Sequence, residues 1–153
     1  MSKKTLSLIR PPKLNSGDKV GVVAPAGPVD KQQLQNGLDV VSKMGFQPIL
    51  GRNVSFRSRF LAGTDLQRAK DIMDMVRNPE VKAIFCARGG YGTNRVLQYL
   101  DAKVIRANAK IFVGSSDITL LLHYLYLHCG MVGFHGPMVA GSFGRAPMNQ
   151  SRK

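Results

Sequence analysis

Short apolar runs alternate along this chain with longer segments in which apolar residues recur at helical spacing. The runs predict strands near residues 19–24, 46–50, 81–87, 110–114 and 131–135. Continuous apolar runs of this length are typical of strands that are buried on both faces of a sheet. Pro48 weakens the second run, because proline has no N–H to donate to a neighbouring strand.

Periodic apolar positions predict helices between these strands. The first helix runs from Asp30 to Lys43 before Gly45, and its apolar positions are Leu34, Leu38, Val41 and Met44. A second begins at Thr64 and Asp65, and its apolar positions are Leu66, Ala69, Ile72, Met73 and Val76. Residues 56–63 predict a loop. Residues 93–100 and 117–129 predict two further helices, the last of them largely buried.

The alternation of strands and helices predicts an α/β fold with a mostly parallel, Rossmann-like sheet flanked by helices. In such sheets ligands bind at the carboxyl ends of the strands. Three predicted strands end in glycine-rich or polar turns, APAGP at 24–28, ARGGYG at 87–92 and GSSD at 114–117. We therefore expect these three motifs to share one site.

Composition agrees with a globular domain, since 153 residues with 44% hydrophobic side chains can bury a core. The N-terminus lacks the apolar segment of a secretory signal, and no apolar stretch is long enough to cross a bilayer. These features predict a cytoplasmic protein without a membrane partner. Cys86 and Cys129 have no metal-ligand spacing and are expected to be buried thiols, so no metal or cofactor is predicted.

The charge is strongly positive, because 22 Lys and Arg face 9 Asp and Glu, for a net charge of +13. The basic residues are scattered rather than clustered, so charge alone is only a weak indication of nucleic-acid binding. The acids are more informative. Glu80 is the only glutamate, and no acidic residue follows Asp117, so no later residue of this sequence can supply a catalytic carboxylate.

Two motifs allow a structural and a functional interpretation. Residues 87–95, ARGGYGTNR, expose backbone N–H groups but match neither a P-loop nor GxGxxG, so a phosphate-binding loop and a purely structural glycine turn stay open. A break from strand to helix at Gly114 can hold one serine exposed as a nucleophile. Ser116 or Asp117 can equally cap the following helix.

Taken in order, APAGP, RFLAGTDLQRAKDI, ARGGYGTNRVL, GSSDIT and HGPM resemble the LD-carboxypeptidase family of serine peptidases, which includes the microcin-immunity peptidases. The likeness runs from about Gly17 to about Phe143. The most specific feature of the likeness is the combination of RGGYG with a later G-x-S-D motif. The family releases the terminal D-amino acid from the tetrapeptide of recycled cell-wall muropeptides, and it implies no metal or cofactor.

The resemblance implies that Ser116 is the nucleophile and that Ser115 is the variable position of G-x-S-D. The backbone N–H of Asp117 faces the expected site, and the resemblance implies a second oxyanion donor in the turn of Gly89 and Gly90. The candidates for the substrate crevice are Arg88, Tyr91 and His135. A salt bridge is an equal alternative for Arg88.

A serine nucleophile needs a base and a group that orients the base. In the family the Glu and His of the triad lie in a C-terminal half that cannot be matched here. His123 and His128 are expected to be partly buried or at an interface. The sequence thus predicts an N-terminal extension (1–16), a nucleophile domain (17–143) and an unstructured, truncated tail (144–153).

In this interpretation the chain is the nucleophile domain of an LD-carboxypeptidase and is inactive by itself. Its expected substrate is a muropeptide or another peptide that ends in a D-amino acid. Its expected partner is a missing C-terminal half or a second copy of the chain. A shortened gene, a frameshift or an artificial boundary would each explain the ending. One alternative is a non-catalytic module that binds a small ligand or nucleic acid in the same crevice. Another is a misfolded or chaperone-dependent remnant.

Overall fold

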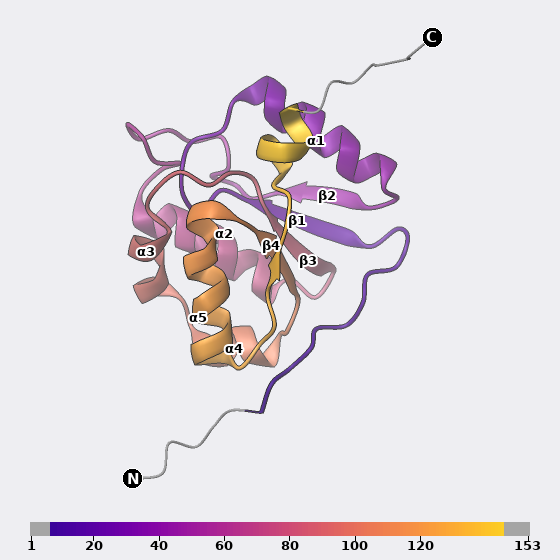
Figure 1. Cartoon of the computed structure of the whole chain (residues 1–153), viewed down its shortest axis with the longest axis vertical. Coiled ribbons are helices and arrows are strands. Elements are labelled where there is room, and N and C mark those ends of the chain that lie inside the picture. The colour runs from indigo at the N-terminus through magenta and orange to yellow at the C-terminus, as the bar shows by residue number, and fades with distance from the viewer. Residues whose placement is uncertain (1–6, 146–153) are drawn as a thin grey trace.

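The computed structural model describes residues 7–145, in which strands and helices alternate as the hydrophobic pattern predicts (Figure 1). The strands are β1 (Lys19–Val23), β2 (Gln47–Leu50), β3 (Val81–Cys86), β4 (Ile111–Gly114) and β5 (Phe134–His135). The α-helices are α1 (Lys31–Lys43), α2 (Asp65–Arg77), α3 (Thr93–Val96), α4 (Ala102–Ala107) and α5 (Thr119–Cys129). Three short helical turns are η1 (Leu97–Tyr99), η2 (Ser116–Ile118) and the π-helix η3 (Val139–Phe143).

The five strands form one parallel sheet in the order β2-β1-β3-β4-β5. This order reverses direction between β1 and β3, which is the point where doubly wound sheets open a crevice for ligands. The predicted fold class is therefore confirmed. Pro48 lies in β2, which is an edge strand, the position where a sheet tolerates proline.

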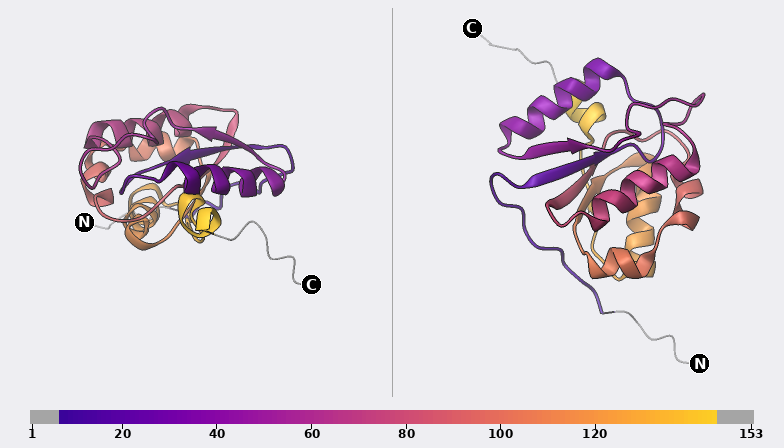
Figure 2. Two further views of the ribbon diagram at one scale, coloured as in Figure 1. Left: turned by 90° about the horizontal axis from the view of Figure 1, so that it is seen from above. Right: turned by 180° about the vertical axis from the view of Figure 1, so that it is seen from behind.

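Two buried clusters cover the two faces of the sheet. On one face α2, α4 and α5 contribute Ile72, Ile105 and Leu121 to a cluster that includes Phe112 of β4. On the other face α1 and η3 pack together, and Val139 of η3 belongs to the second cluster. Figure 2 shows the C-terminal turn, in yellow, lying beside α1. The last described residues therefore complete one face of the core.

Helix starts follow the predicted signals. Asp30 caps α1 by accepting a hydrogen bond from the N–H of Gln33, and Thr64 forms a capping box with Gln67 at the start of α2. The hydrophobic pattern missed α4, which is six residues long and is capped by Asp101. A short helix has too few turns to show a periodic apolar face.

Several predicted positions are corrected by the structure. The last strand is only Phe134–His135, because Met131 forms no more than an isolated bridge with Ile9. The helical period places Met44 and Leu66 on buried faces, but these side chains are 50% and 62% exposed. Both lie at a helix end, where the neighbouring elements no longer cover the apolar face.

The histidines of α5 were expected to be partly buried or at an interface. His123 and His128 are exposed, so partial burial is wrong and an interface stays a prediction, because α5 packs on the sheet through Leu121, Leu122, Leu125 and Cys129. The opposite side of this helix carries exposed Leu120, Tyr126 and Leu127, so periodicity alone did not identify its buried face. The two cysteines are buried free thiols, as predicted.

The ends of the chain are described only in part. Of the expected extension, residues 7–16 are described, and Ile9 exchanges backbone hydrogen bonds with the segment after α5. Of the expected tail, Gly144 and Arg145 are helical, while 146–153 lie outside the described residues. Between residues 7 and 145, no helix combines the length and the apolar character needed to cross a membrane.

Candidate active site

The three loops predicted to share a site meet at the carboxyl edge of the sheet. Gly27, after β1, donates its N–H to the carbonyl oxygen of Gly89, after β3, at 3.0 Å. Thr93, at the start of α3, donates its N–H to the carboxylate of Asp117, after β4, at 2.9 Å. These two hydrogen bonds therefore hold the APAGP, ARGGYG and GSSD motifs together.

Arg68 of α2 fixes two of these loops. Its guanidinium is 1% exposed and donates to the carbonyl oxygens of Pro25 and Gly92, the latter at 2.8 Å, and it pairs with Asp65. Burial lowers the pKa of Arg68 and the Asp65 carboxylate opposes that shift, but arginine stays protonated at neutral pH. Arg68 is not among the residues that the sequence predicts for the site, although it lies within the AGTDLQR motif.

Ser116 occupies a sharp turn between β4 and α5. Its φ is +56°, in the left-handed region that a side chain other than glycine rarely adopts, and its side chain is exposed. Ser115 is extended, with φ −153°. The prediction that Ser116 lies at a strand-to-helix turn is confirmed. Backbone strain of this kind gathers at functional sites.

The alternative role of Ser116 or Asp117 as a helix cap is wrong. Neither η2 nor α5 has a side-chain hydrogen bond at its N-cap, which is Ser115 for η2 and Ile118 for α5. The Asp117 carboxylate instead accepts from Thr93, on a different loop. Its role in the fold is to join the Ser116 turn to the glycine loop.

The glycine loop approaches Ser116 closely. A Cβ placed on Gly89 would come within 3.0 Å of the Ser116 Cβ and 3.1 Å of its Oγ, and within 3.6 Å of the Asp117 nitrogen. Gly90 has a φ of +115° and lies against Gly27. Only residues without a side chain allow the backbone of this loop to reach the serine.

A hollow of about 330 Å³ opens beside Ser116. It is lined by Arg88, Gly89, Gly90, Ser116, Met138, Gly141, Ser142 and Arg145. The structure thus brings Arg88, Gly89 and Gly90 to the serine, as the sequence predicts. The four residues from η3 and its flanks were missed, because nothing local indicates that this turn folds back over the sheet.

Of the three predicted crevice residues, only Arg88 lines this hollow. It donates to the carbonyl oxygen of Pro28 at 2.6 Å and forms no salt bridge with any described residue, so the salt-bridge alternative is wrong. Tyr91 lines a neighbouring hollow. His135 pairs with Gly114 through the backbone and is exposed, and no histidine or carboxylate among residues 7–145 lines the hollow at Ser116.

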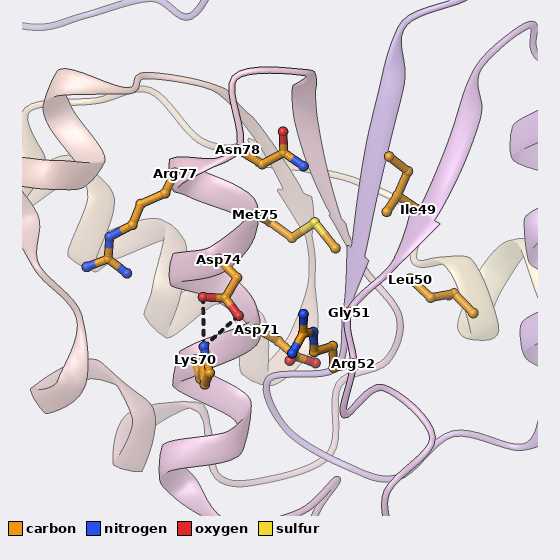
Figure 3. Close-up of a pocket in the computed structure, with 10 residues that line it drawn as sticks. All are labelled: Ile49, Leu50, Gly51, Arg52, Lys70, Asp71, Asp74, Met75, Arg77 and Asn78. Carbon is orange, nitrogen blue, oxygen red and sulfur yellow. Dashed lines mark hydrogen bonds and ion pairs between the residues drawn. The ribbon is translucent and has the colours of Figure 1, made fainter.

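A separate groove of about 520 Å³ lies between α2 and the end of β2 (Figure 3). Three of its charged groups are engaged with their neighbours: Lys70 pairs with Asp74, and the Asp71 carboxylate accepts two hydrogen bonds from Asn53. Burial raises the pKa of Asp71, and the Asn53 hydrogen bonds oppose that shift. Because this groove holds no strained nucleophile, the hollow at Ser116 is the candidate active site.

Comparison with known proteins gives the family of this chain. The family model of the LD-carboxypeptidase N-terminal domain, peptidase family S66, matches residues 20–136. The chain belongs to this family. It is 43% identical over 135 residues to a Bacillus subtilis protein described as a probable murein peptide carboxypeptidase, covering 88% of this chain and 42% of that protein.

Solved structures of LD-carboxypeptidase relatives share the fold. An MccF-like protein from Bacillus anthracis superposes with a TM-score of 0.85 at 34% identity, over 89% of this chain and 42% of that one. The muramoyltetrapeptide carboxypeptidase of Oxalobacter formigenes superposes with a TM-score of 0.76 at 34% identity, over 86% and 44%. The chain therefore spans less than half the length of these LD-carboxypeptidase relatives.

Proposed function

We propose that this chain is the nucleophile-bearing domain of a serine LD-carboxypeptidase that releases the terminal D-amino acid from muropeptide tetrapeptides. One observation carries the proposal: Ser116 is exposed and strained at a strand-to-helix turn, with the backbone of Gly89 against its hydroxyl. The names of two relatives, a murein peptide carboxypeptidase and a muramoyltetrapeptide carboxypeptidase, support the substrate class.

In the proposed reaction, the Ser116 Oγ attacks the carbonyl carbon of the last peptide bond while a general base takes its proton. The carbonyl oxygen becomes an oxyanion, stabilised by the backbone N–H of Asp117 and by an N–H of the Gly89 and Gly90 turn. The base then protonates the leaving amine, and the D-amino acid departs. Water hydrolyses the acyl-serine in the same way and frees the shortened peptide.

The base and the group that orients it come, in this proposal, from a part of the relatives that the chain does not span, or from a second copy. The described residues that line the hollow include arginines but no imidazole and no carboxylate. Arg88 lines this hollow and, in this proposal, binds the terminal carboxylate of the substrate. The proposed setting is the cytoplasm, where muropeptides are recycled.

The experiment measures D-alanine release from an L,D-linked muramoyl tetrapeptide. Purified chain is assayed alone and after addition of the C-terminal half of a relative. The chain alone is expected to show little turnover, because oxyanion stabilisation and binding without a complete triad leave only about 10³- to 10⁴-fold over water. With the second half present, Ser116→Ala is expected to abolish turnover and Ser115→Ala to retain most of it.

Equal losses in the two serine variants would contradict the assignment of Ser116. Turnover by the chain alone in the usual enzyme range of about 1 to 10³ per second, lost in Ser116→Ala, would support the nucleophile and contradict the incomplete triad. Unchanged D-alanine release in Ser116→Ala would overturn the proposed function.

A further inference from the structure

A second hollow, of about 590 Å³, adjoins the one at Ser116 and shares Arg88 and Gly90 with it. Its lining residues are Gly27, Pro28, Arg57, Arg59, Phe60, Arg88, Gly90 and Tyr91. Three arginines thus line a space that no carboxylate lines. Neither Arg57 nor Arg59 forms an ion pair with an acidic side chain in the described part of the chain.

The loop that carries these arginines is anchored at both ends. At its root, Asn53 donates its backbone N–H and its side-chain amide to the Asp71 carboxylate of α2, at 2.9 and 2.7 Å. At its far end, Ala62 donates to the carbonyl oxygen of Ala26 at 2.9 Å. Both ends are therefore fixed to elements that also position the candidate active site.

The tip of the loop presents Arg59 in an unfavourable conformation. Ser58 and Leu61 exchange backbone hydrogen bonds at 2.8 and 3.0 Å, which leaves Arg59 and Phe60 as the two turn residues. Arg59 has a φ of +56°, where such a turn favours glycine or asparagine. Backbone strain of this kind clusters at functional sites.

Two aromatic rings line the same hollow as the arginines. Phe60 and Tyr91 are 59% and 50% exposed, and their ring centroids lie 5.9 Å apart at an interplanar angle of 57°. Planar guanidinium groups bind carboxylates in a two-pronged geometry, and aromatic rings beside them contact the apolar part of the same ligand. The three arginines share the lining of one hollow, a confined space that suits a small anionic group better than a nucleic-acid backbone.

We propose that Arg57 and Arg59, next to Arg88, form an anion subsite that binds a side-chain carboxylate of an acidic peptide whose scissile end lies at Ser116. The placement of the scissile end at Ser116 rests on the proposed function, whereas the binding of a carboxylate by the arginines does not depend on it. Arg88 belongs to both hollows, so it links the two parts of one ligand. Arg57 and Arg59 then determine which peptides the crevice prefers.

The test measures binding by calorimetry to the full chain carrying Ser116→Ala, so that no hydrolysis interferes. One probe is a tetrapeptide that ends in D-alanine and carries two side-chain carboxylates, and the other is the same peptide with both side chains amidated. The acidic probe is expected to bind at least tenfold more tightly. Adding Arg57→Gln and Arg59→Gln together is expected to remove that preference and to leave the affinity for the amidated probe unchanged.

Arg52→Gln is the matched control, because Arg52 is an exposed arginine of the same loop that lines the groove of Figure 3 instead. Circular dichroism and thermal unfolding of each variant verify that it folds. Equal binding of the two probes, no measurable binding of the acidic probe, or an equal loss in Arg52→Gln would overturn the subsite. So would a single-stranded oligonucleotide that binds through Arg57 and Arg59 in place of the peptide.

The subsite and the proposed function fail separately. A charge preference that depends on Arg57 and Arg59, in a protein whose Ser116 proves dispensable for hydrolysis, would support the subsite and contradict the proposed function. Serine-dependent D-alanine release with no charge preference in binding would support the proposed function and contradict the subsite. The binding assay and the hydrolysis assay therefore distinguish the two ideas.

Discussion

The carboxylate of Asp117 accepts a hydrogen bond from the backbone N–H of Thr93 at 2.9 Å, across 24 residues of chain. This bond joins the turn that presents Ser116 to the helix that follows the glycine loop. Asp117 thus contributes to the candidate site twice, through its side chain as a tether and through its backbone N–H as a proposed oxyanion donor. The relative position of the serine and the glycines depends on it.

Asp117→Ala is expected to destabilise the protein by about 1 kcal/mol, because it leaves the Thr93 N–H without its partner. Asp117→Asn keeps an acceptor oxygen and should cost less. Urea unfolding measures both. Asp101→Ala is the control, since Asp101 caps α4 and does not line the hollow at Ser116; it should lower stability similarly without changing ligand binding at Ser116. If Asp117→Ala and Asp101→Ala impaired ligand binding at Ser116 equally, the Asp117 side chain would not be what holds the serine turn to the glycine loop.

Gly89→Ala is expected to abolish activity in any reconstituted enzyme, because the new Cβ would lie 3.0 Å from the Ser116 Cβ and 3.1 Å from its Oγ. Gly141 lines the same hollow, but a Cβ there would meet only Met138, at 3.4 Å, which is ordinary contact. Gly141→Ala should therefore retain activity. Comparable kcat/KM values for the two variants would show that the Gly89 approach is not required.

Ser116→Gly is expected to stabilise the fold by up to about 1 kcal/mol while removing the nucleophile, because glycine adopts a φ of +56° without strain. Ser115→Gly is the matched control. Ser115 is already extended, so the same change there gains nothing and loses stability through the added freedom of the unfolded chain. Thermal and urea unfolding compare the two. A Ser116→Gly variant no more stable than Ser115→Gly would contradict the strain at the serine.

Lys110 makes stability depend on pH in the alkaline range. Its ammonium is buried and donates to the carbonyl oxygens of Met75 and Asn78, and burial, with Lys82 nearby, lowers its pKa from 10.5 to about 8. Between these values the unfolded chain binds the proton more tightly than the folded one. The contribution of Lys110 to the unfolding free energy should therefore rise from pH 8 to 10.5, by up to about 3 kcal/mol.

The measurement is the difference in unfolding free energy between the protein and Lys110→Met across that pH range. Subtracting the variant removes the titration of tyrosines and exposed lysines, which both proteins share. A constant difference would show that the Lys110 ammonium keeps an ordinary pKa.

Much of the fold was determined by the sequence alone, because strand and helix patterns depend on residues close together in the chain. The apolar runs located β1 to β4 within one or two residues, and the cap signals at Asp30 and Thr64 located two helix starts. The GSSD turn lies directly after a predicted strand, but the sequence pattern left its role open between a nucleophile and a helix cap, and only the resemblance to the LD-carboxypeptidase family pointed to Ser116.

Only the tertiary structure decided which residues surround that serine, because a hollow is made by segments that are distant in sequence. The turn at 139–145 reaches the site by packing on α1, and Arg68 is buried by carbonyl groups from two other loops. Likewise Met44 and Leu66 follow a helical period yet stay exposed, since burial requires a neighbouring element that local sequence does not specify.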